Sequence, residues 1–508
     1  MEKKNYQDSI AVLKESTMFH MSLGSKELFH SNFLHWISLV DWKVFLEIMH
    51  GLSDTNKFWW EETDCSIPGY EGPFCPDNNN LEVRREYHHF DLSIYILDSE
   101  NEDKEANNQE VVKDDEDGLA YNQDAQGARK VQKWIPVLIL ENKMKSIPYD
   151  EQLEQYTLDA FNEWRRGELI SPCIKELKGK AGTTILEKKG ISFILLSLMK
   201  SASITDVVKI PFQYYKNKYS FPFRWFHRTY SDLLSALSDK VHFKKELDEL
   251  ILIDYRGFLK AMIDLGERWT IDPKESFRCQ VYPWKIKNRP AQNRIIEIEQ
   301  YKELRIHDIH EKLTYCHLLS ILDQKLSSEF KYKPKRYDAK TNTQCYQKGC
   351  RLFTKSDYAH GVGIFEVQYF VFPFNPQEKG KEDFFKLILQ VQGDRYCHML
   401  ICNDIVEESD NVVGKQNKKT SVNIKNLEKH WKNSNVSIDQ SIGNYISING
   451  SNPSIFKSEP ENGKYCHYGK NNIYQYVEIP ENATVNDVIN QMISDIKDID
   501  EWVSKIRL

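Results

Sequence analysis

The most distinctive hydrophobic pattern in the chain is an apolar run at residues 135–140 that ends in Glu141, Asn142 and Lys143. An unbroken run of mostly branched aliphatic residues is typical of a strand that is buried on both faces. Successive side chains of a strand point to opposite faces. We therefore expect Glu141 and Lys143 to lie side by side on one face of a central strand, with Asn142 on the other face.

The segments around this strand predict further helices and strands. Residues 86–96 alternate polar and apolar side chains, as expected of a strand, and Asp91 occupies one of the polar positions. Apolar residues three and four positions apart predict helices at 25–50 and 149–165. Later segments predict a strand at 191–198 and helices at about 229–237 and 245–264. This order describes an α/β domain with a mixed central sheet flanked by helices.

The pattern changes beyond about residue 270. A long helical pattern at about 292–328 precedes three predicted strands, and another helical pattern follows them; these segments are 363–374, 384–391, 396–402 and about 484–506. A chain of 508 residues favours two or three domains. We predict an α/β domain over residues 1–270 and a C-terminal α+β accessory domain over residues 271–508.

Composition and charge narrow the classes of protein that this chain can be. With 40% hydrophobic and 12% aromatic residues, the chain can bury substantial cores. A net charge of −7 argues against a protein that coats nucleic acid by bulk electrostatics, although it does not exclude a nuclease. Residues 98–117 hold ten acidic side chains and two lysines, and the stretch of about 98–128 has no apolar period. We expect this acidic stretch to be a loop inserted between the two strands.

The chain shows no sequence signal for export or membrane insertion. It begins Met-Glu-Lys-Lys without an apolar signal segment, and no stretch approaches the roughly 18–20 apolar residues that span a bilayer. The ten cysteines are irregularly spaced, which suits reduced thiols better than a disulfide framework. We therefore expect a cytoplasmic protein with no membrane partner.

Four charged residues fall on elements that can meet in space and could together hydrolyse a phosphodiester. Asp91 and Glu141 supply the hard carboxylate oxygens that Mg²⁺ or Mn²⁺ prefers. An ammonium group such as that of Lys143 can orient a water molecule or stabilise charge that develops on a phosphate. Glu27, in the first turn of its helix, could be a further ligand or could simply favour the positive end of that helix. Glu86 is the alternative to Asp91.

This arrangement resembles the PD-(D/E)XK nuclease superfamily, with Asp91 as its aspartate and Glu141 to Lys143 as its (D/E)XK element. Residues 25–34 resemble the acidic first helix of that fold. Residues 150–156 resemble the glutamine-and-tyrosine helix that follows the catalytic strand. The resemblance is to families of bacterial proteins linked to restriction or antiphage defence.

The resemblance covers roughly residues 20–265 and departs from the family pattern at two points. Phe90 stands where the name of the motif has proline, a position that varies and is not chemically required. Asp91 and Glu141 are 50 residues apart, so the acidic loop must be an insertion on the connecting turn. Long polar insertions at loop tips are thermodynamically tolerable.

Carried over residue by residue, the resemblance implies roles for particular side chains. It implies metal binding by the carboxylates of Asp91, Glu141 and Glu27. It also implies that Lys143 activates the attacking water or stabilises charge, and that Gln152 or Gln155 contacts DNA or orders the water.

We therefore predict a PD-(D/E)XK restriction-endonuclease-like core that acts as a Mg²⁺-dependent DNA endonuclease, with a role in prokaryotic antiphage defence. Two alternatives stay open: a catalytically silent nucleic-acid-binding or regulatory module, and an RNA-directed nuclease. DNA is favoured over RNA as the partner. The C-terminal domain could also bind a protein partner or a second copy of the chain.

Overall fold

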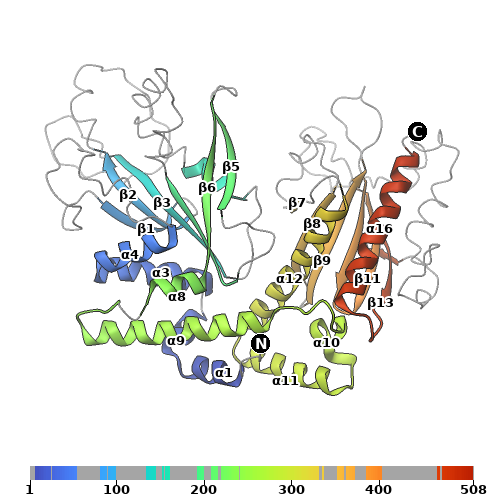
Figure 1. Cartoon of the computed structure of the whole chain (residues 1–508), viewed down its shortest axis with the longest axis horizontal. Helices are drawn as coiled ribbons and strands as arrows, with labels where there is room; N and C mark the ends of the chain where they lie inside the picture. The colour runs from blue at the N-terminus through green and yellow to red at the C-terminus, as the bar shows by residue number, and fades with distance from the viewer. Residues whose placement is uncertain are drawn as a thin grey trace, which may run out of the picture.

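The described part of the chain in the computed structural model forms two β-sheets, each with helices packed against it (Figure 1). The structure describes residues 6–23, 26–53, 81–87, 90–98, 133–144, 152–153, 155–160, 191–199, 207–214, 219–238, 241–330, 335–336, 352–359, 362–371, 385–402, 466–468 and 472–506. The predicted acidic loop lies outside these residues, apart from its first position, Asp98. No helix within the described ranges is both long and apolar enough to cross a bilayer.

The first sheet has six strands in the order β1-β2-β3-β4-β6-β5. Its strands are β1 (Leu81–Tyr87), β2 (Phe90–Asp98), β3 (Lys133–Lys143), β4 (Ser192–Ser197), β5 (Val207–Tyr214) and β6 (Tyr219–Thr229). β3 lies inside the sheet, antiparallel to β2 and parallel to β4. The sheet is therefore mixed and flanked by helices, which confirms the α/β architecture predicted from the sequence.

The sequence pattern missed the β5–β6 hairpin. Pro211 and Pro222 lie opposite each other in this hairpin, and a proline within an apolar run argues against a strand. The structure accommodates Pro222 because β4 pairs with β6 only between Trp225 and Thr229 of β6. The two prolines thus lie in the part of the hairpin that extends past β4 (Figure 1).

The pairing of β2 with β3 contains one shift in register. Leu92 lies opposite Leu140, whereas Tyr95 lies opposite Pro136, so the register shifts by one residue between Ile94 and Tyr95. Proline has no N–H group to donate to a strand ladder, and bulges occur at such interruptions. The pairing between the shift and the C-terminal end of β3 is regular. That regular part carries the predicted site residues.

Two consecutive helices, α3 (Lys26–Val40) and α4 (Trp42–Ser53), pack against the first sheet. The sequence pattern predicted a single helix over both. The helix is interrupted at Asp41, whose side chain accepts hydrogen bonds from the backbone N–H groups of Lys43 (3.1 Å) and Val44 (3.2 Å). Asp41 therefore caps the start of α4. The apolar pattern continues across this cap, which is why periodicity alone did not show the boundary.

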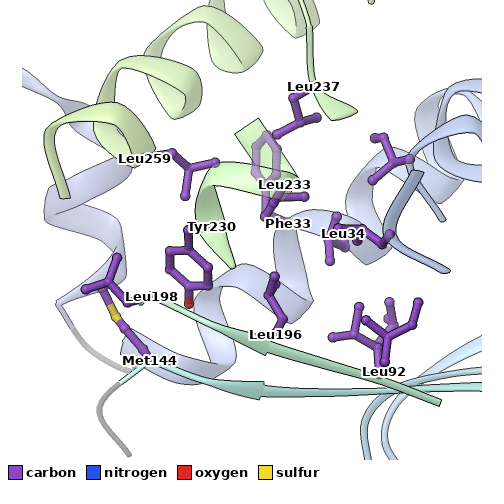
Figure 2. Packing of buried hydrophobic residues seen from close by; sticks show 14 of the residues in the cluster. Phe33, Leu34, Leu92, Met144, Leu196, Leu198, Tyr230, Leu233, Leu237 and Leu259 are labelled. Atoms are coloured by element: carbon purple, nitrogen blue, oxygen red, sulfur yellow. The ribbon is translucent and has the colours of Figure 1, made fainter. Parts of the chain in front are cut away.

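A continuous apolar cluster joins the helices to the strands. Figure 2 shows Phe33 and Leu34 of α3 above Leu92 of β2 and Leu196 of β4, with the ring of Tyr230 beside them. Because a fully buried Leu or Phe side chain contributes about 1.5–3 kcal/mol, this cluster holds helices and sheet together. Further helices of this part are α1 (Tyr6–Glu15), α2 (Thr17–Ser22), α8 (Tyr230–Ala236) and α9 (Glu246–Arg268).

The long helical pattern predicted near residues 292–328 corresponds to two helices, α11 (Arg289–Glu303) and α12 (His307–Glu329). They are separated at Arg305, whose φ of 56° lies in the left-handed region that often ends a helix. Arginine is not a residue that marks such a position in a sequence, so the break was not predicted. Two short elements precede them, α10 (Phe277–Val281) and η3 (Pro283–Lys285).

The second sheet has seven strands in the order β12-β13-β11-β10-β9-β8-β7. Its strands are β7 (Lys335–Arg336), β8 (Leu352–Ala359), β9 (Val362–Val371), β10 (Phe385–Gln392), β11 (Arg395–Cys402), β12 (Cys466–Tyr468) and β13 (Asn472–Glu478). Figure 1 shows α12 and α16 (Val485–Ile506) on one face of this sheet. The three predicted strands match β9, β10 and β11, and the last predicted helix matches α16.

The helix α12 contributes to two hydrophobic clusters. Ile309 and Leu313, in its first half, belong to the cluster of the first sheet. Tyr315 and Leu318, in the next turns, belong to the cluster of the second sheet. A single helix therefore connects the two cores.

Gly363 of β9 packs directly against Tyr315 of α12, and this contact gives a testable prediction. A Cβ atom at Gly363 would lie 2.1 Å from Tyr315 Cδ2, far inside van der Waals contact. Because Tyr315 is only 1% exposed, its ring cannot simply move aside. We expect Gly363→Ala to lower the free energy of unfolding by about 1–3 kcal/mol, measured by chemical denaturation and circular dichroism.

The same substitution at Gly257, inside α9, is the matched control. The nearest atom to a Cβ at Gly257 would be 3.9 Å away, an ordinary contact. Alanine is favoured over glycine inside a helix by about 1 kcal/mol. Gly257→Ala should therefore leave stability unchanged or raise it. Equal losses at the two positions would contradict the close approach of Tyr315 to Gly363.

Candidate active site

The end of β3 brings two carboxylates together on one face of the first sheet. Leu92 of β2 lies opposite Leu140 of β3, so the next step of the antiparallel register places Asp91 opposite Glu141. Directly opposed side chains in a sheet share a face. The Asp91 carboxylate also accepts a hydrogen bond from the backbone N–H of Asn142, at 2.6 Å. This contact fixes Asp91 at the end of β3.

Lys143 lies beside Glu141 on the same face. Its Nζ is 2.6 Å from Glu141 Oε1, and the two side chains are 15% and 2% exposed. This placement confirms the prediction that Glu141 and Lys143 emerge side by side. A buried ammonium and carboxylate at this distance interact far more strongly than an exposed pair does.

The electrostatics of the site are dominated by Glu141. Burial, and after it the negative charge of Asp91, raises the pKa of Glu141 to about 7, while Lys143 acts in the opposite direction. Burial alone would lower the pKa of Lys143, but the neighbouring anions, Glu141 first, raise it above its usual value. Lys143 is therefore a cation at neutral pH, and Glu141 is close to its titration midpoint.

One oxygen of Glu141 is available to a ligand. Its Oε2 is buried and has no hydrogen-bond partner among the residues that the structure describes. A buried carboxylate oxygen without a partner is costly. With Asp91 nearby, the donor set is one of hard oxygens, which suits Mg²⁺ or Mn²⁺. These two carboxylates could hold such an ion.

The helical residues that follow β3 cover the same face. The Gln152 amide donates a hydrogen bond to the Tyr156 hydroxyl at 2.7 Å. The half-buried ring of Tyr156 packs between Phe90 and Trp225, with centroid separations of 6.2 and 6.5 Å. Burial, and then the charge of Glu141, raises the pKa of Tyr156 to about 12. Gln152 is thus linked to the site through Tyr156.

Gln155, the alternative to Gln152, is not brought to the site. Its side chain is exposed and donates a hydrogen bond to Asp159 at 2.8 Å. Of the two glutamines, Gln152 is therefore the one that the structure places near Glu141. The sequence pattern alone assigned Tyr156 no role in the site, because a tyrosine on the apolar face of a helix is more often a core side chain.

The opposite face of β3 is fixed by a buried hydrogen bond. Tyr230 donates to Asn142 Oδ1 at 2.9 Å, and both residues are fully buried. Figure 2 shows the Tyr230 hydroxyl directed at the strands, near Met144. The ring of His30, in α3, lies 4.6 Å from the ring of Tyr230. The beginning of α3 therefore lies at the end of β3 that carries Asn142.

This location also places Glu27. Glu27 is in the first turn of α3, about one turn before His30, so its backbone is near the C-terminal end of β3. α3 packs on the face to which Asn142 points, opposite to the Glu141 carboxylate. The side chain of Glu27 lies outside the described part of the chain. Its role as a ligand stays a prediction.

Two further polar residues join the site face from the neighbouring strands. Ser197 of β4 is the register partner of Lys143, and its Oγ lies 2.8 Å from His227 Nε2. Ser197 donates to the Met199 carbonyl at 2.8 Å, so it accepts from the imidazole N–H. Both are buried. The sequence pattern did not single them out, because a serine and a histidine at strand ends carry no distinctive spacing.

The chain was compared with protein-family models, with curated proteins and with solved structures, and none of the three comparisons gives a match. The interpretation of the site therefore rests on its own residues and geometry.

The pKa of Glu141 predicts a pH-dependent stability. A carboxyl whose pKa is about 7 in the folded protein and ordinarily 4.5 contributes stability that is complete below pH 4.5 and is lost as the pH rises through 7. The free energy of unfolding of the wild type should therefore fall between pH 5 and pH 8 relative to Glu141→Gln, by up to about 1.4 kcal/mol per pH unit. Urea denaturation without metal measures this.

The control for this prediction is Glu329→Gln. Glu329 is an exposed carboxylate paired with Lys497 at 2.8 Å, and this pair lowers its pKa rather than raising it. Glu329→Gln should show the same slope as the wild type in this pH range. Parallel curves for the wild type and Glu141→Gln would show that Glu141 is not the titrating group.

Proposed function

We propose that this protein is a metal-dependent nuclease that hydrolyses phosphodiester bonds of DNA, with a core of the PD-(D/E)XK type. The observation that carries the proposal is the convergence of Asp91, Glu141 and Lys143 at one end of β3. Two carboxylates and a lysine on one sheet face form a compact set for phosphodiester hydrolysis. The mixed sheet, with helices on it, supports the same fold.

Asp91 and Glu141 would hold a Mg²⁺ or Mn²⁺ ion, and the supporting role of Glu27 stays a prediction from the resemblance. The donor set fits the ion, because Glu141 Oε2 is buried without a partner in the described part of the chain and Asp91 raises the cost of ionising Glu141. When bound, the ion would supply Lewis-acid activation of a water molecule and neutralise phosphate charge.

The protein side chains divide the remaining work. The pKa of Lys143 is raised, so Lys143 keeps its proton and stabilises charge on the phosphate rather than acting as a general base. Tyr156, held by Gln152 and by its packing on Trp225, lies beside Glu141, whose charge raises the pKa of the Tyr156 hydroxyl. Asn142, bound to Tyr230, anchors the strand on the other face.

The alternatives make different predictions. A silent nucleic-acid-binding module would bind DNA without cutting it, and an RNA-directed nuclease would cut only RNA. A buried Glu141 of raised pKa favours an enzyme, because a binding module has no need of a costly carboxylate. The role in antiphage defence, and recognition of a partner by residues 271–508, rest on resemblance and position alone.

Metal-dependent cleavage tests the proposal directly. The full chain is incubated with supercoiled DNA, linear DNA and RNA, with Mg²⁺ or Mn²⁺ and with EDTA. We expect DNA cleavage that EDTA abolishes and that Asp91→Ala and Lys143→Ala each reduce by about 100-fold or more, because each loses a charge at the reacting phosphate. Lys497→Ala, which removes an exposed lysine from an ion pair with Glu329, is the matched control.

Three outcomes would count against the proposal. Cleavage that survives both substitutions would show that Asp91 and Lys143 are not part of the catalytic site. Binding of DNA without cleavage of any substrate would favour the silent module, and cleavage of RNA alone would favour the RNA-directed enzyme.

The pKa of Glu141 also predicts the pH dependence of cleavage. Glu141 must be ionised to bind a cation, so at low Mg²⁺ the rate should rise with pH through about 7. Because a cation favours the ionised carboxylate, more Mg²⁺ should move this midpoint to lower pH. Single-turnover rates from pH 5.5 to 8.5 at two Mg²⁺ concentrations measure both effects. A midpoint that does not respond to Mg²⁺ would show that Glu141 is not a ligand of the metal.

A further inference from the structure

A second group of potential metal ligands lies far along the chain from the proposed active site, on α12. His307, His310 and Glu311 occupy positions i, i+3 and i+4 of the first turns of this helix. Residues at this spacing lie on one face of a helix. One possible ligand atom from each of the three lies within 4.8 Å of the others. Small side-chain rotations bring such atoms onto a single ion.

His310 and Glu311 are buried and His307 is half-buried, and several of their polar atoms lack a partner within the described ranges. His310 is 2% exposed and Glu311 9% exposed. The Nδ1 atoms of His307 and His310 are buried and have no hydrogen-bond partner within the described ranges. Two unpartnered imidazole nitrogens on one helix face are costly without a ligand. Surface histidines would have water for this purpose.

The charge states also suit a cation. Burial lowers the pKa values of both His307 and His310, so both rings are neutral at pH 7, which is the form that binds metals. Burial raises the pKa of Glu311 to about 7. A cation beside this carboxyl would favour its ionised form.

The surroundings hold the ligands in place. The backbone N–H of Gly363 in β9 donates to Glu311 Oε2 at 3.3 Å. Glu311 Oε1 remains on the side of His307, 3.9 Å from its Nε2. A hydrogen bond to one oxygen of a carboxylate orients its other oxygen toward a metal. Glu311 is therefore directed at the histidines.

Arg294 is the group that must adjust. It donates to His310 Nε2 at 2.8 Å and also pairs with Glu297 at 3.0 Å. Binding through His310 Nδ1 transfers the ring proton to Nε2, and Arg294 then keeps Glu297 as its partner. This exchange leaves no charge unpaired.

We propose that His307, His310 and Glu311 form a binding site for a divalent transition-metal ion, with Zn²⁺ as the ion that best fits two imidazoles and one carboxylate. Three protein ligands leave a fourth position open. The site differs in chemistry from the oxygen donors of Asp91 and Glu141, which suit harder ions. It also lies where α12 passes from one core to the other, so a bound ion stabilises that junction.

Titration of the full chain with Co²⁺ and then Zn²⁺ tests the site. Co²⁺ bound by imidazoles in a site of low coordination number gives intense visible bands, whereas an all-oxygen octahedral site gives weak ones. We expect one equivalent of Co²⁺ to produce intense bands and Zn²⁺ to displace it. His307→Gln and Glu311→Gln should each weaken binding by at least the roughly 10–100-fold that the loss of an outer-shell partner costs. Circular dichroism verifies that both variants fold.

Two control variants separate this site from others. His242 pairs with Glu249 at 2.9 Å and has no second histidine in the pair, so His242→Gln should leave Co²⁺ binding unchanged. Asp91→Asn should also leave the intense bands unchanged, which distinguishes this site from the proposed active site. Absence of tight binding by the wild type, or full retention of the bands in His307→Gln, would overturn the proposal.

Discussion

The fixed alternation of side chains along β3 is the constraint on which the candidate site depends. Tyr230 holds Asn142 on one face, and Asp91 binds the backbone N–H of the same residue. With Asn142 fixed, Glu141 and Lys143 can only emerge on the other face. A slip of one residue would bury the lysine against the helices and remove both charged groups from Asp91. Two hydrogen bonds to one asparagine therefore set the register of the whole site.

The same arrangement leaves the negative charge of the site only partly compensated. Lys143 offsets the charge of Glu141, yet burial and Asp91 together still raise the pKa of Glu141. Replacing such a group by an apolar residue would be the simpler way to a stable core. Keeping the buried Glu141 carboxyl close to Asp91 lowers the stability of the folded protein at this site. In the proposed function, this cost is offset when a cation binds.

Parts of this structure could be predicted from the sequence and parts could not, for physical reasons. The faces of Glu141 and Lys143 follow from strand geometry alone, so periodicity was sufficient. The break at Asp41 depends on a side chain capping a backbone, and the break at Arg305 depends on a left-handed φ, neither of which alters the apolar pattern. Tyr156 and Ser197 reach the site through tertiary packing. His307 and Glu311 share a helix face, but the contact that orients Glu311, with Gly363 of β9, depends on tertiary packing.

The sharing of α12 between the two cores has a consequence for how the chain can be divided. Tyr301 and Ile309 are fully buried members of the first cluster, although they follow residue 270. A fragment that stops at residue 270 would uncover the apolar surface that these side chains protect. Local unfolding of the first turns of α12 would likewise disturb the packing of both clusters. A piece of the N-terminal half that keeps this surface covered would have to extend to about Leu313, in the helix that also belongs to the second cluster.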